Sequence, residues 1–538
     1  MSDTKTIEIQ IQQQNLYSGK IDSKSRFTDQ DKAGLIEQSK KIQEQFKREL
    51  EAASTSEGRA HLKKVLRGWT LPWIDVDCPE SDIFQDPLDQ DGSIVSSNKT
   101  FQSIIDIAGR VRDEETEVWV NIGIGGSDLP TQALVSSTLN SQHNNLSKEK
   151  RGGAPQVYFV GNDFSPEKVH DLLASLEERD LLLKTKFNVV SKSGATQETL
   201  SAFLIIREFI SQALKKGGEQ PIALEDGSEY FKTGKFFVAT TGLNEKSVLF
   251  QLNQKKYGAN QEKDEFFAML PVPDGTGGRF SGFSSVGLLA LAVTANKNLG
   301  ETPQTRIQDT MNGIKDVLTE CLNLDVSDEK NIAFQTAMNH VIAEKNKNKS
   351  LLIMVMYDPL MKQVGDIAQQ LYSESVQKFG QGLDFLSIVG SEKMHSIWNG
   401  AVEGTGAERD IVLFIGTQKT DSTRDPIIPK GSGISGKEIV SMEGLNLSTV
   451  QTASLQGVSK DATERGILNY SLLLPERSLR QVARLIYLFQ TLVAVEGKLR
   501  GLEKEQYEDG SYKDYTYLQD GVEGYKIQTR EILGKLKG

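Results

Sequence analysis

Short apolar runs alternate with stretches of helical periodicity from about residue 100 onward, and this alternation restricts the possible folds more than any other feature of the chain. The apolar runs lie at 117–124, 156–160, 187–190 and 235–240. Helical stretches lie between them, among them 166–176 and 247–257. Buried strands that alternate with helices form mainly parallel sheets with helices on both faces. The pattern therefore predicts an α/β fold.

A second round of the same pattern begins near residue 350. Strands are predicted at 350–357, 384–389 and 411–416, and helices at 361–379 and 475–499. Before this round, a helix predicted at 282–298 leads out of the first sheet, and a helical run at 521–537 ends the chain. A loop rich in Gly, Pro and Lys is expected at 418–436. With 538 residues the chain is too long for one core. We therefore expect two doubly wound halves of similar size, although no repeat is visible between their sequences.

The first hundred residues are polar and charge-rich, unlike the rest. An amphipathic helix is predicted at 33–53, and Trp69 and Trp73, within 66–77, are expected to pack onto a later core. This region predicts a helical wrapper without chemistry of its own. The predicted units are the wrapper at 1–100, a first domain at 101–300, a second domain at 301–510 and a helical extension at 511–538.

Charge and cysteine content exclude several classes of protein. The formal net charge is −11, which disfavours nucleic acid and anionic lipid as partners. Cys78 and Cys321 are the two cysteines and form no CxxC pair, so neither a disulfide scaffold nor a cysteine-based zinc site is expected. The N-terminal sequence has no apolar signal region, and the longest apolar run, near 286–295, is far shorter than a membrane span. These features favour a cytoplasmic protein.

The stretch 187–199, FNVVSKSGATQET, has the composition of an anion site. A predicted strand leads into small hydroxyl residues and a glycine, and a helix follows at once. The first N–H groups of a helix have no partner within it, and the helix dipole favours an anion there. Ser191, Ser193 and Thr196 add hydroxyl groups, and Lys192 adds a positive charge. The alternative is an ordinary strand-to-helix turn with a capping hydroxyl. The GK[ST] ending of a nucleotide-binding loop is absent.

Two further motifs could contact a ligand. The motif NIGIGGSD at 121–128 follows the first strand, and Gly126 and Ser127 lie where a doubly wound sheet binds ligands. Its GxGGS spacing differs from the GxGxxG of dinucleotide sites, and a tight turn is the simpler alternative. Arg279, in the segment GGRFS, could present a permanent charge to an anion, although most arginines are merely solvated.

Acid–base candidates lie in the second round of the pattern. Gln370 and Glu374 are four residues apart in a predicted helix and therefore share a face. Glu374 could be a tuned base, although a solvated carboxylate is the commoner case. His395 follows a predicted strand and a short polar link, which places it at the same kind of sheet edge. No spacing of His and carboxylate residues is typical of a metal site.

Taken together, these segments resemble the phosphoglucose isomerase family. The matching motifs are GIGGSDL at 123–129, SKSGATQET at 191–199, GGRFS at 277–281, QQxxxES at 369–375, His395, and GVExxK at 521–526. Each motif alone is moderately specific, but six in the family's order are strongly specific. They span about residues 121 to 526, which is most of the chain.

The resemblance implies a fold, an assembly and an activity. The expected fold is two sugar-isomerase domains, each a three-layer αβα sandwich, with helical extensions at both ends. The family is expected to form homodimers whose active sites are completed by the partner chain, and to need no metal and no organic cofactor. The implied reaction interconverts glucose 6-phosphate and fructose 6-phosphate in glycolysis and gluconeogenesis. Tolerance of mannose 6-phosphate, and a non-catalytic sugar-phosphate sensor on the same fold, remain open alternatives.

The resemblance also implies a role for individual positions. Residues expected to hold the sugar phosphate are Gly126, Ser127, Ser191, Lys192, Ser193 and Thr196. Glu374 is expected to move the proton between C1 and C2, and Arg279 to stabilise the enediolate. His395 and Lys526 are expected to open the sugar ring. Gln370 and Glu198 are expected to line the site.

Overall fold

The structure, a computed structural model, describes residues 8–52, 55, 99–224, 226–272, 276–431, 433, 436–506, 512–519, 521 and 523–537. The predicted packing of Trp69 and Trp73 lies outside the described residues, as does Cys78. The predicted wrapper helix is confirmed as α1 (Asp29–Ala52), which packs against helices of the second half.

A five-stranded parallel sheet forms the centre of the first half. Its strands are β2 (Val118–Ile122), β3 (Gln156–Val160), β4 (Thr185–Val190), β7 (Phe237–Thr241) and β10 (Ala268–Pro271), in the order β10-β7-β4-β2-β3. Every residue of β2, β4 and β7 is buried. Strands covered on both faces read as continuous apolar runs, which is why the first four were predictable from the sequence.

A second five-stranded sheet repeats this arrangement. Its strands are β1 (Gln10–Gln12), β11 (Leu351–Met356), β12 (Asp384–Val389), β13 (Asp410–Lys419) and β14 (Leu468–Glu476), in the order β1-β14-β13-β11-β12. Only β1 is antiparallel to its neighbour, with Ile11 opposite Leu472. In both sheets, the first four parallel strands along the chain lie in the spatial order second, first, third, fourth: β3-β2-β4-β7 and β12-β11-β13-β14. The two halves therefore share one topology.

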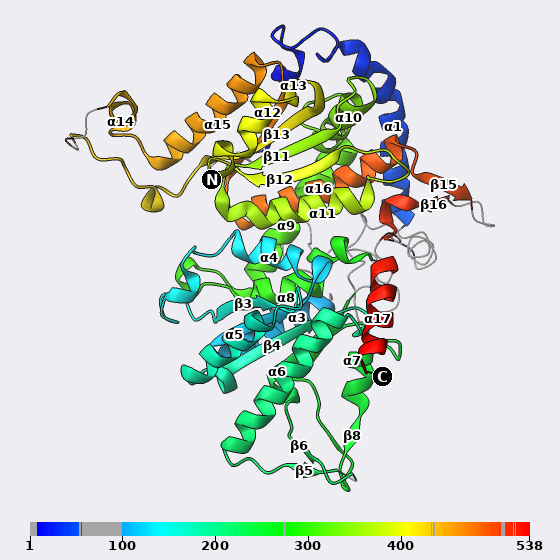
Figure 1. The fold of residues 1–538 in the computed structure, drawn as a ribbon, viewed down its shortest axis with the longest axis vertical. Helices are drawn as coiled ribbons and strands as arrows, with labels where there is room; N and C mark the ends of the chain where they lie inside the picture. Colours follow the sequence, from blue (N-terminus) through cyan, green and yellow to red (C-terminus); the bar gives the residue numbers. More distant parts are fainter. Residues whose placement is uncertain are drawn as a thin grey trace.

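Helices cover both faces of the first sheet (Figure 1). They are α3 (Lys99–Asp113), α4 (Leu129–Ser136), α5 (Pro166–Glu178), α6 (Gln197–Lys216), α7 (Val248–Gln254) and α8 (Ser285–Val293). Leu173 of α5 and Phe203 of α6 pack with Val120 of β2 on one face. Phe101 of α3 and Leu288 of α8 belong to the core on the other face. The predicted three-layer αβα arrangement is confirmed.

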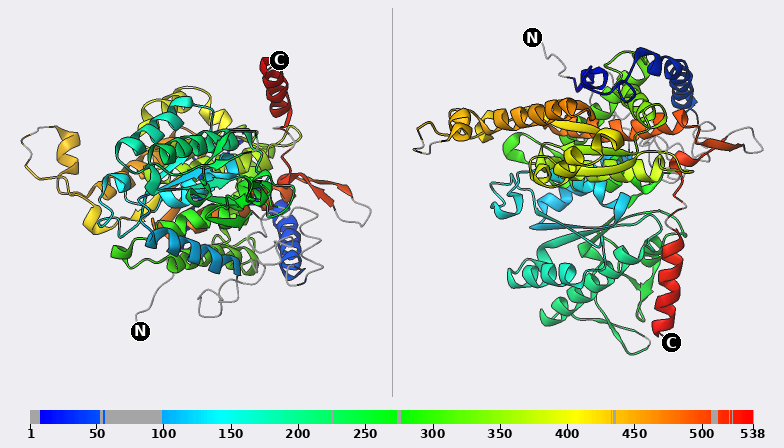
Figure 2. Two further views of the ribbon diagram at one scale, coloured as in Figure 1. Left: turned by 90° about the horizontal axis from the view of Figure 1, so that it is seen from below. Right: turned by 45° about the horizontal axis from the view of Figure 1, so that its top comes forward.

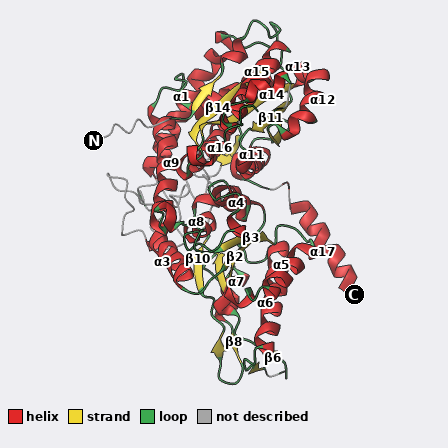
Figure 3. Cartoon of the chain, turned by 90° about the vertical axis from the view of Figure 1, so that its left-hand side faces the viewer, coloured by secondary structure: helices red, strands yellow, loops and turns green. Residues whose placement is uncertain are grey.

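The second sheet is covered in the same way (Figure 3). Its helices are α9 (Pro303–Asn323), α10 (Ile332–Lys345), α11 (Lys362–Ser375), α12 (Ile397–Glu403), α13 (Gly406–Arg409), α14 (Lys437–Met442), α15 (Leu447–Glu464) and α16 (Leu479–Leu499). Trp398 of α12 and Leu455 of α15 pack on one face, whereas α10, α11 and α16 belong to the core on the other. That core extends into the first half, where α4 contacts α11.

Some predicted element boundaries were wrong. The helix predicted at 475–499 begins only at Leu479, because the apolar run before it forms the missed strand β14. The helix predicted at 282–298 is the shorter α8, preceded by the 3-10 helix η7 (Gly278–Phe283). The helix predicted at 247–257 ends at Gln254 with α7, and β8 (Lys256–Tyr257) follows it.

Several short elements project from the two domains. They are the hairpins of β5 (Ile222–Ala223) with β6 (Glu229–Tyr230), β8 with β9 (Glu262–Lys263), and β15 (Glu503–Gln506) with β16 (Tyr512–Asp514). The β15–β16 hairpin and α14 project from opposite sides of the molecule (Figure 2). The chain continues into α17 (Glu523–Lys537), as predicted. Among the helices of the described residues, none has both the length and the apolar character that a membrane span requires.

Candidate active site

The strand order of the first sheet places two predicted ligand loops at one crevice. From β2 the chain moves to β3 on one side and then to β4, β7 and β10 on the other, so the order reverses between β2 and β4. Open parallel sheets bind ligands at their carboxyl edge where the order reverses. The loop of residues 123–128 follows β2, and the loop of residues 191–196 follows β4. Both loops therefore flank the expected ligand position.

The loop after β4 has the features of an anion site. The hydroxyl oxygens of Ser191 and Thr196 lie 3.0 Å apart. Gly194, at φ +63°, turns the chain so that its N–H donates to the carbonyl of Ser191 at 3.1 Å. Thr196 is the N-cap residue of α6, but its side chain does not cap the helix. The N-terminus of this 20-residue helix therefore keeps N–H groups for an anion.

The loop after β2 packs between η7 and α11. It contains the 3-10 helix η3 (Gly125–Ser127), in which Gly125 has φ +55°. A Cβ atom on Gly126 would lie 2.0 Å from the carbonyl carbon of Gly278 and 2.4 Å from the nitrogen of Arg279. A Cβ on Gly125 would lie 3.3 Å from Nε2 of Gln370. These glycines therefore let the loop contact both segments directly.

Replacing Gly126 with alanine is expected to lower both stability and activity. Because the added methyl group would meet backbone on η7, the two segments must separate, at a cost of about 1–3 kcal/mol in the free energy of unfolding. Urea unfolding measures this loss. Gly109→Ala is the matched control, since Gly109 lies within α3 with nothing within 4 Å of the added Cβ. A Gly126→Ala protein as stable as the control would contradict this description of the loop.

Arg279 is held between the two halves of the chain. Its side chain has no exposed surface. Its Nε donates to the hydroxyl of Ser375 at 2.8 Å, and its Nη2 donates to the carbonyl of Thr516 at 2.7 Å. Thr516 belongs to the 3-10 helix η12 (Tyr515–Tyr517). Burial lowers the pKa of Arg279, and the Glu374 carboxylate acts in the opposite direction. An arginine side chain holds its proton so strongly that the guanidinium remains a cation.

Glu374 is the carboxylate that this cation faces. Nη1 of Arg279 donates to its Oε2 at 3.1 Å, and Nε2 of Gln370 donates to its Oε1 at 2.9 Å. The Glu374 side chain is 19% exposed, so it can still meet a ligand. Gln370 in turn lies against Gly125, as described above. The sequence-predicted residues Arg279, Gln370 and Glu374 are therefore one cluster, beside the loop that contains Gly126 and Ser127.

Other predicted residues are not part of this cluster. His395 ends the 3-10 helix η10 (Glu392–His395) and is exposed. Lys526 is half-buried in the first turn of α17, which lies at the level of the first sheet (Figure 1). In the described part of the chain, the hydrogen bonds to Glu374 come from Arg279 and Gln370, and none comes from His395. Glu198 is half-buried in the first turn of α6.

Several residues that hold the cluster were not predicted from the sequence. Ser375 and the carbonyls of Thr516 and Leu518 accept hydrogen bonds from Arg279. Gln490, on α16, donates to the carbonyl of Arg279 at 3.4 Å. Backbone carbonyls have no sequence signature, and Ser375 has one only as the last residue of the QQxxxES motif. These contacts become visible only when the two domains are packed.

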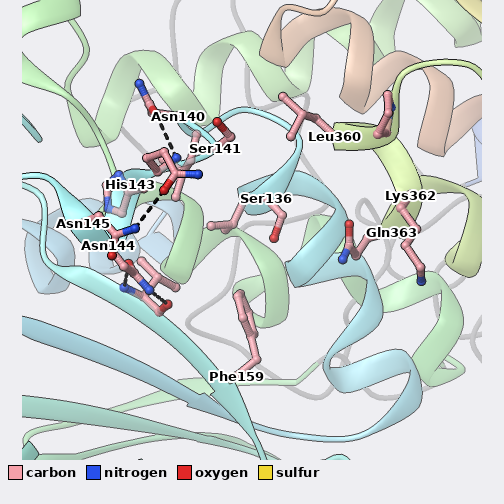
Figure 4. A pocket seen from close by; sticks show the side chains of 15 residues that line it. Ser136, Asn140, Ser141, His143, Asn144, Asn145, Phe159, Leu360, Lys362 and Gln363 are labelled. Carbon is pink, nitrogen blue, oxygen red and sulfur yellow. Dashed lines mark hydrogen bonds between the residues drawn. The ribbon is translucent and has the colours of Figure 1, made fainter. Parts of the chain in front are cut away.

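A separate pocket of about 370 Å³ lies at the other end of α11 (Figure 4). Its polar groups are largely paired within the chain. The Asn144 side chain bonds both the N–H and the carbonyl of Val157 at 2.8 Å, and Nε2 of His143 lies 2.9 Å from the carbonyl of Pro155. Lys362 pairs with Asp366 at 2.6 Å. Lys362 precedes Glu374 by twelve residues, or about 18 Å of helix, so this pocket is not the Glu374 site.

No group of three or more His, Cys, Asp or Glu side chains within the described residues is arranged to hold a metal ion. The candidate chemistry rests on what the described residues do bring together, the Arg279–Glu374 pair beside the two ligand loops. A buried cation beside a partly exposed carboxylate suits proton abstraction next to a carbonyl, because the cation stabilises the oxyanion that forms.

Comparisons with known proteins identify the family. The sequence profile described as phosphoglucose isomerase matches residues 22–407. The glucose-6-phosphate isomerase of Pediococcus pentosaceus is 31% identical over 437 residues, covering 81% of this chain and 84% of that protein. The corresponding enzyme of Alkaliphilus metalliredigens is 30% identical with the same coverage.

Solved structures share the fold. A hypothetical protein from Thermus thermophilus matches with a TM-score of 0.65 and 20% identity, over 98% of this chain and 99% of that chain. A glucose-6-phosphate isomerase from Chlamydia trachomatis matches with a TM-score of 0.62 and 18% identity, over 90% of this chain and 86% of that chain. The fold, the ordered motifs and the profile match together show that this chain belongs to the phosphoglucose isomerase family.

Proposed function

We propose that this protein interconverts glucose 6-phosphate and fructose 6-phosphate, the step that these sugars undergo in glycolysis and gluconeogenesis. The observation that carries the proposal is the pairing of buried Arg279 with Glu374 beside the loop that contains Ser127. The names of the relatives from Pediococcus and Alkaliphilus support it. A sugar phosphate has one anionic end and one end that must lose a proton, and the two parts of the site match these needs.

The loops of the first domain would bind the phosphate. Ser127, Ser191, Ser193 and Thr196 supply hydroxyl groups, Lys192 supplies charge, and the N-terminus of α6 supplies N–H groups. A grip on the phosphate fixes the orientation of the distant carbons and contributes binding energy at the transition state. This assignment includes Gly126, whose lack of a side chain lets the loop pack directly against the backbone of Gly278 and Arg279.

The second domain would carry out the proton transfer. Aldose–ketose exchange removes a proton beside a carbonyl and returns it to the neighbouring carbon, so one base must reach both C1 and C2. Glu374 is that base in our proposal. The negative charge that develops on oxygen in the enediolate is stabilised by the guanidinium of Arg279. Gln370 orients the carboxylate through its bond to Oε1, and Glu198 lines the phosphate side.

Ring opening requires an acid and a base at the ring oxygen and O1, and we assign these roles to His395 and Lys526. The exposure of His395, and its lack of a bond to Glu374 in the described chain, support a site that the second copy of a homodimer completes.

Mixing two inactive variants tests the shared site. If His395 serves the partner's site, a dimer of Glu374→Gln with His395→Ala holds one site with both native residues. Random exchange of equal amounts makes about half the dimers mixed, so about a quarter of wild-type activity should return. Unmixed samples are the controls. A mixture no more active than the sum of its parts, despite proven subunit exchange, would contradict the shared site.

A coupled assay of glucose 6-phosphate formation from fructose 6-phosphate tests the activity itself. Turnover by the purified protein supports the proposal, and its absence sinks it. A thermal shift with fructose 6-phosphate identifies the sensor alternative, which predicts stabilisation without turnover. Parallel kinetics on mannose 6-phosphate decide whether the site also accepts the other configuration at C2.

A further inference from the structure

A ladder of buried polar side chains crosses the first sheet beneath the ligand loops. Oγ1 of Thr240, on β7, donates to Oδ1 of Asn188, on β4, at 2.9 Å. Nδ2 of Asn188 donates to Oδ1 of Asn121, on β2, at 2.9 Å. None of the three side chains is exposed. Because Oδ1 of Asn121 accepts the bond from Asn188, the Asn121 amide is fixed in orientation, and its Nδ2 can donate to another group.

Asp128 lies at this end of the ladder and is 1% exposed. Its Oδ2 accepts from Nε2 of Gln132 at 2.6 Å and from Nδ2 of Asn162 at 3.4 Å. Its Oδ1 is buried and has no hydrogen-bond partner among the described residues. Within the same part of the chain, Nδ2 of Asn121 and Oδ1 of Asn162 are also buried without partners. Asn121 nonetheless interacts favourably with this carboxyl and lowers its pKa.

These atoms suit two protonation states of the same carboxyl. In the charged state, Asn121 acts as a donor to the carboxylate. In the neutral state, the carboxyl needs an acceptor for its proton, and Asn162, whose Nδ2 already lies 3.4 Å from Oδ2, carries an unpartnered Oδ1. Burial raises the pKa of Asp128 to about 7, while the bonds from Gln132 and Asn162 act in the opposite direction. The carboxyl is therefore balanced between both states near neutral pH.

Few charges face this carboxyl. Lys168, on α5, acts on it through its charge and favours the charged form. That lysine is exposed and paired with Asp163. Asp128 is also the N-cap residue of α4, although its side chain does not cap the helix. The helix N-terminus favours the charged form as well. The neighbours on β2, on α4 and after β3 are neutral amides.

We propose that Asp128 is a positioning residue of the Gly125–Ser127 loop and takes up a proton when an anionic sugar phosphate binds. This inference rests on the proposed function for the identity of the ligand. Asp128 directly follows Ser127, one of the residues assigned to the phosphate. A phosphate dianion beside Ser127 disfavours a second negative charge and displaces water, and both effects favour the neutral carboxyl. The proton comes from hydronium in the solvent: its O–H bond in hydronium breaks, which leaves water, and a new O–H bond forms at Oδ1.

The uptake of this proton has two consequences. It removes a charge that would repel the phosphate. It also supplies a donor for the unpartnered Oδ1 of Asn162, which adds to the existing bond from Nδ2 of Asn162 to Oδ2 of Asp128. Binding should therefore weaken as pH rises above 7, because the proton becomes harder to supply.

The stability of the free protein tests the carboxyl without any ligand. The pKa of Asp128 is raised from its ordinary value of 3.8 to about 7 in the folded state. Between these values the folded protein holds more protons than the unfolded chain, so its stability falls as pH rises. Asp128→Asn mimics the neutral acid, so its stability should not fall with pH through this residue. We expect the difference in melting temperature, variant minus wild type, to be about 5 °C larger at pH 8 than at pH 5.

Calorimetry with sorbitol 6-phosphate, which cannot isomerise, tests the coupling to binding. Measured at pH 7.5 in two buffers of different ionisation enthalpy, wild type should take up about half a proton per site and Asp128→Asn less than about a tenth. From pH 6.5 to 8.5, the Kd of wild type should rise by a factor about ten times larger than the factor for the variant. The control is Asp171→Asn, because Asp171 is exposed on α5, and it should behave as wild type.

The outcomes separate this inference from the proposed function. Equal proton uptake by wild type and Asp128→Asn, with sorbitol 6-phosphate bound by both, overturns the coupling and leaves the isomerase proposal standing. A ligand that binds neither protein overturns both. A melting difference that does not change with pH overturns the balanced carboxyl. The expected uptake in wild type, lost in the variant, supports the inference, and a merely structural role would not produce it.

Discussion

Replacing Glu374 with glutamine is expected to lower kcat for fructose 6-phosphate by about 10²- to 10⁴-fold, with KM changed less than about threefold. The amide has the same size but cannot accept the proton that the reaction moves. The loops that we propose to bind the phosphate are untouched, so substrate binding should change little. Steady-state kinetics in the coupled assay, with a melting curve to confirm folding, measure the effect.

Asp366→Asn is the matched control for this variant. Asp366 lies on the same helix, α11, in a surface pair with Lys362. Its replacement also converts a carboxylate to an amide, yet it should leave kcat within about twofold of wild type, since surface pairs contribute little. Unchanged activity in Glu374→Gln, or an equal loss in both variants, would remove Glu374 from the reaction.

Replacing Arg279 with lysine is expected to lower kcat by about 10²- to 10³-fold, comparable to the loss of one oxyanion-stabilising donor elsewhere. The guanidinium reaches Glu374, Ser375 and the carbonyl of Thr516 at the same time. An ammonium group is a point charge with a shorter reach, so it cannot keep all three contacts. The substitution should also lower the melting temperature, because it leaves buried acceptors without a donor.

A second buried arginine separates the catalytic effect from the structural one. Arg306 is 1% exposed, pairs with Glu301 at 2.9 Å and donates to the carbonyl of Leu291 at 3.0 Å. Arg306→Lys should lower the melting temperature in the same way but leave kcat of the folded protein within about threefold of wild type. If both variants lose activity in proportion to stability alone, Arg279 has no catalytic role.

Much of the fold was predictable because its central strands are buried on both faces. The central strands β2, β4, β7, β11 and β13 are largely buried, and such strands of a parallel sheet read as mainly apolar runs. The edge strands β3 and β12 were also predicted, although they are only partly buried. The strand β14 was missed because its sequence, LNYSLLLPE, precedes a long apolar helix, and periodicity cannot divide such a run. The strand β1 has three residues and no pattern of its own.

The site was predictable only in part. The family resemblance implies that Arg279 and Glu374 serve one site, but it does not imply the ion pair that the structure shows between them. The carbonyl of Thr516, one of the groups that hold the pair, lies 237 positions from Arg279 in the sequence. The environment of the Asp128 carboxyl was also hidden. Gln132 lies only four residues further along the chain, but Asn162 comes from the segment after β3, 34 positions away, and no local pattern records that contact.

A crystal structure with sorbitol 6-phosphate tests most directly whether one sugar phosphate spans both halves of the chain. Our account predicts that the phosphate contacts Ser191, Thr196 and the N-terminus of α6. It also predicts that C1 and C2 lie within reach of the Glu374 carboxylate, with Arg279 behind it. A phosphate bound elsewhere, for example in the pocket beside Lys362, or a sugar held away from Glu374, would contradict it.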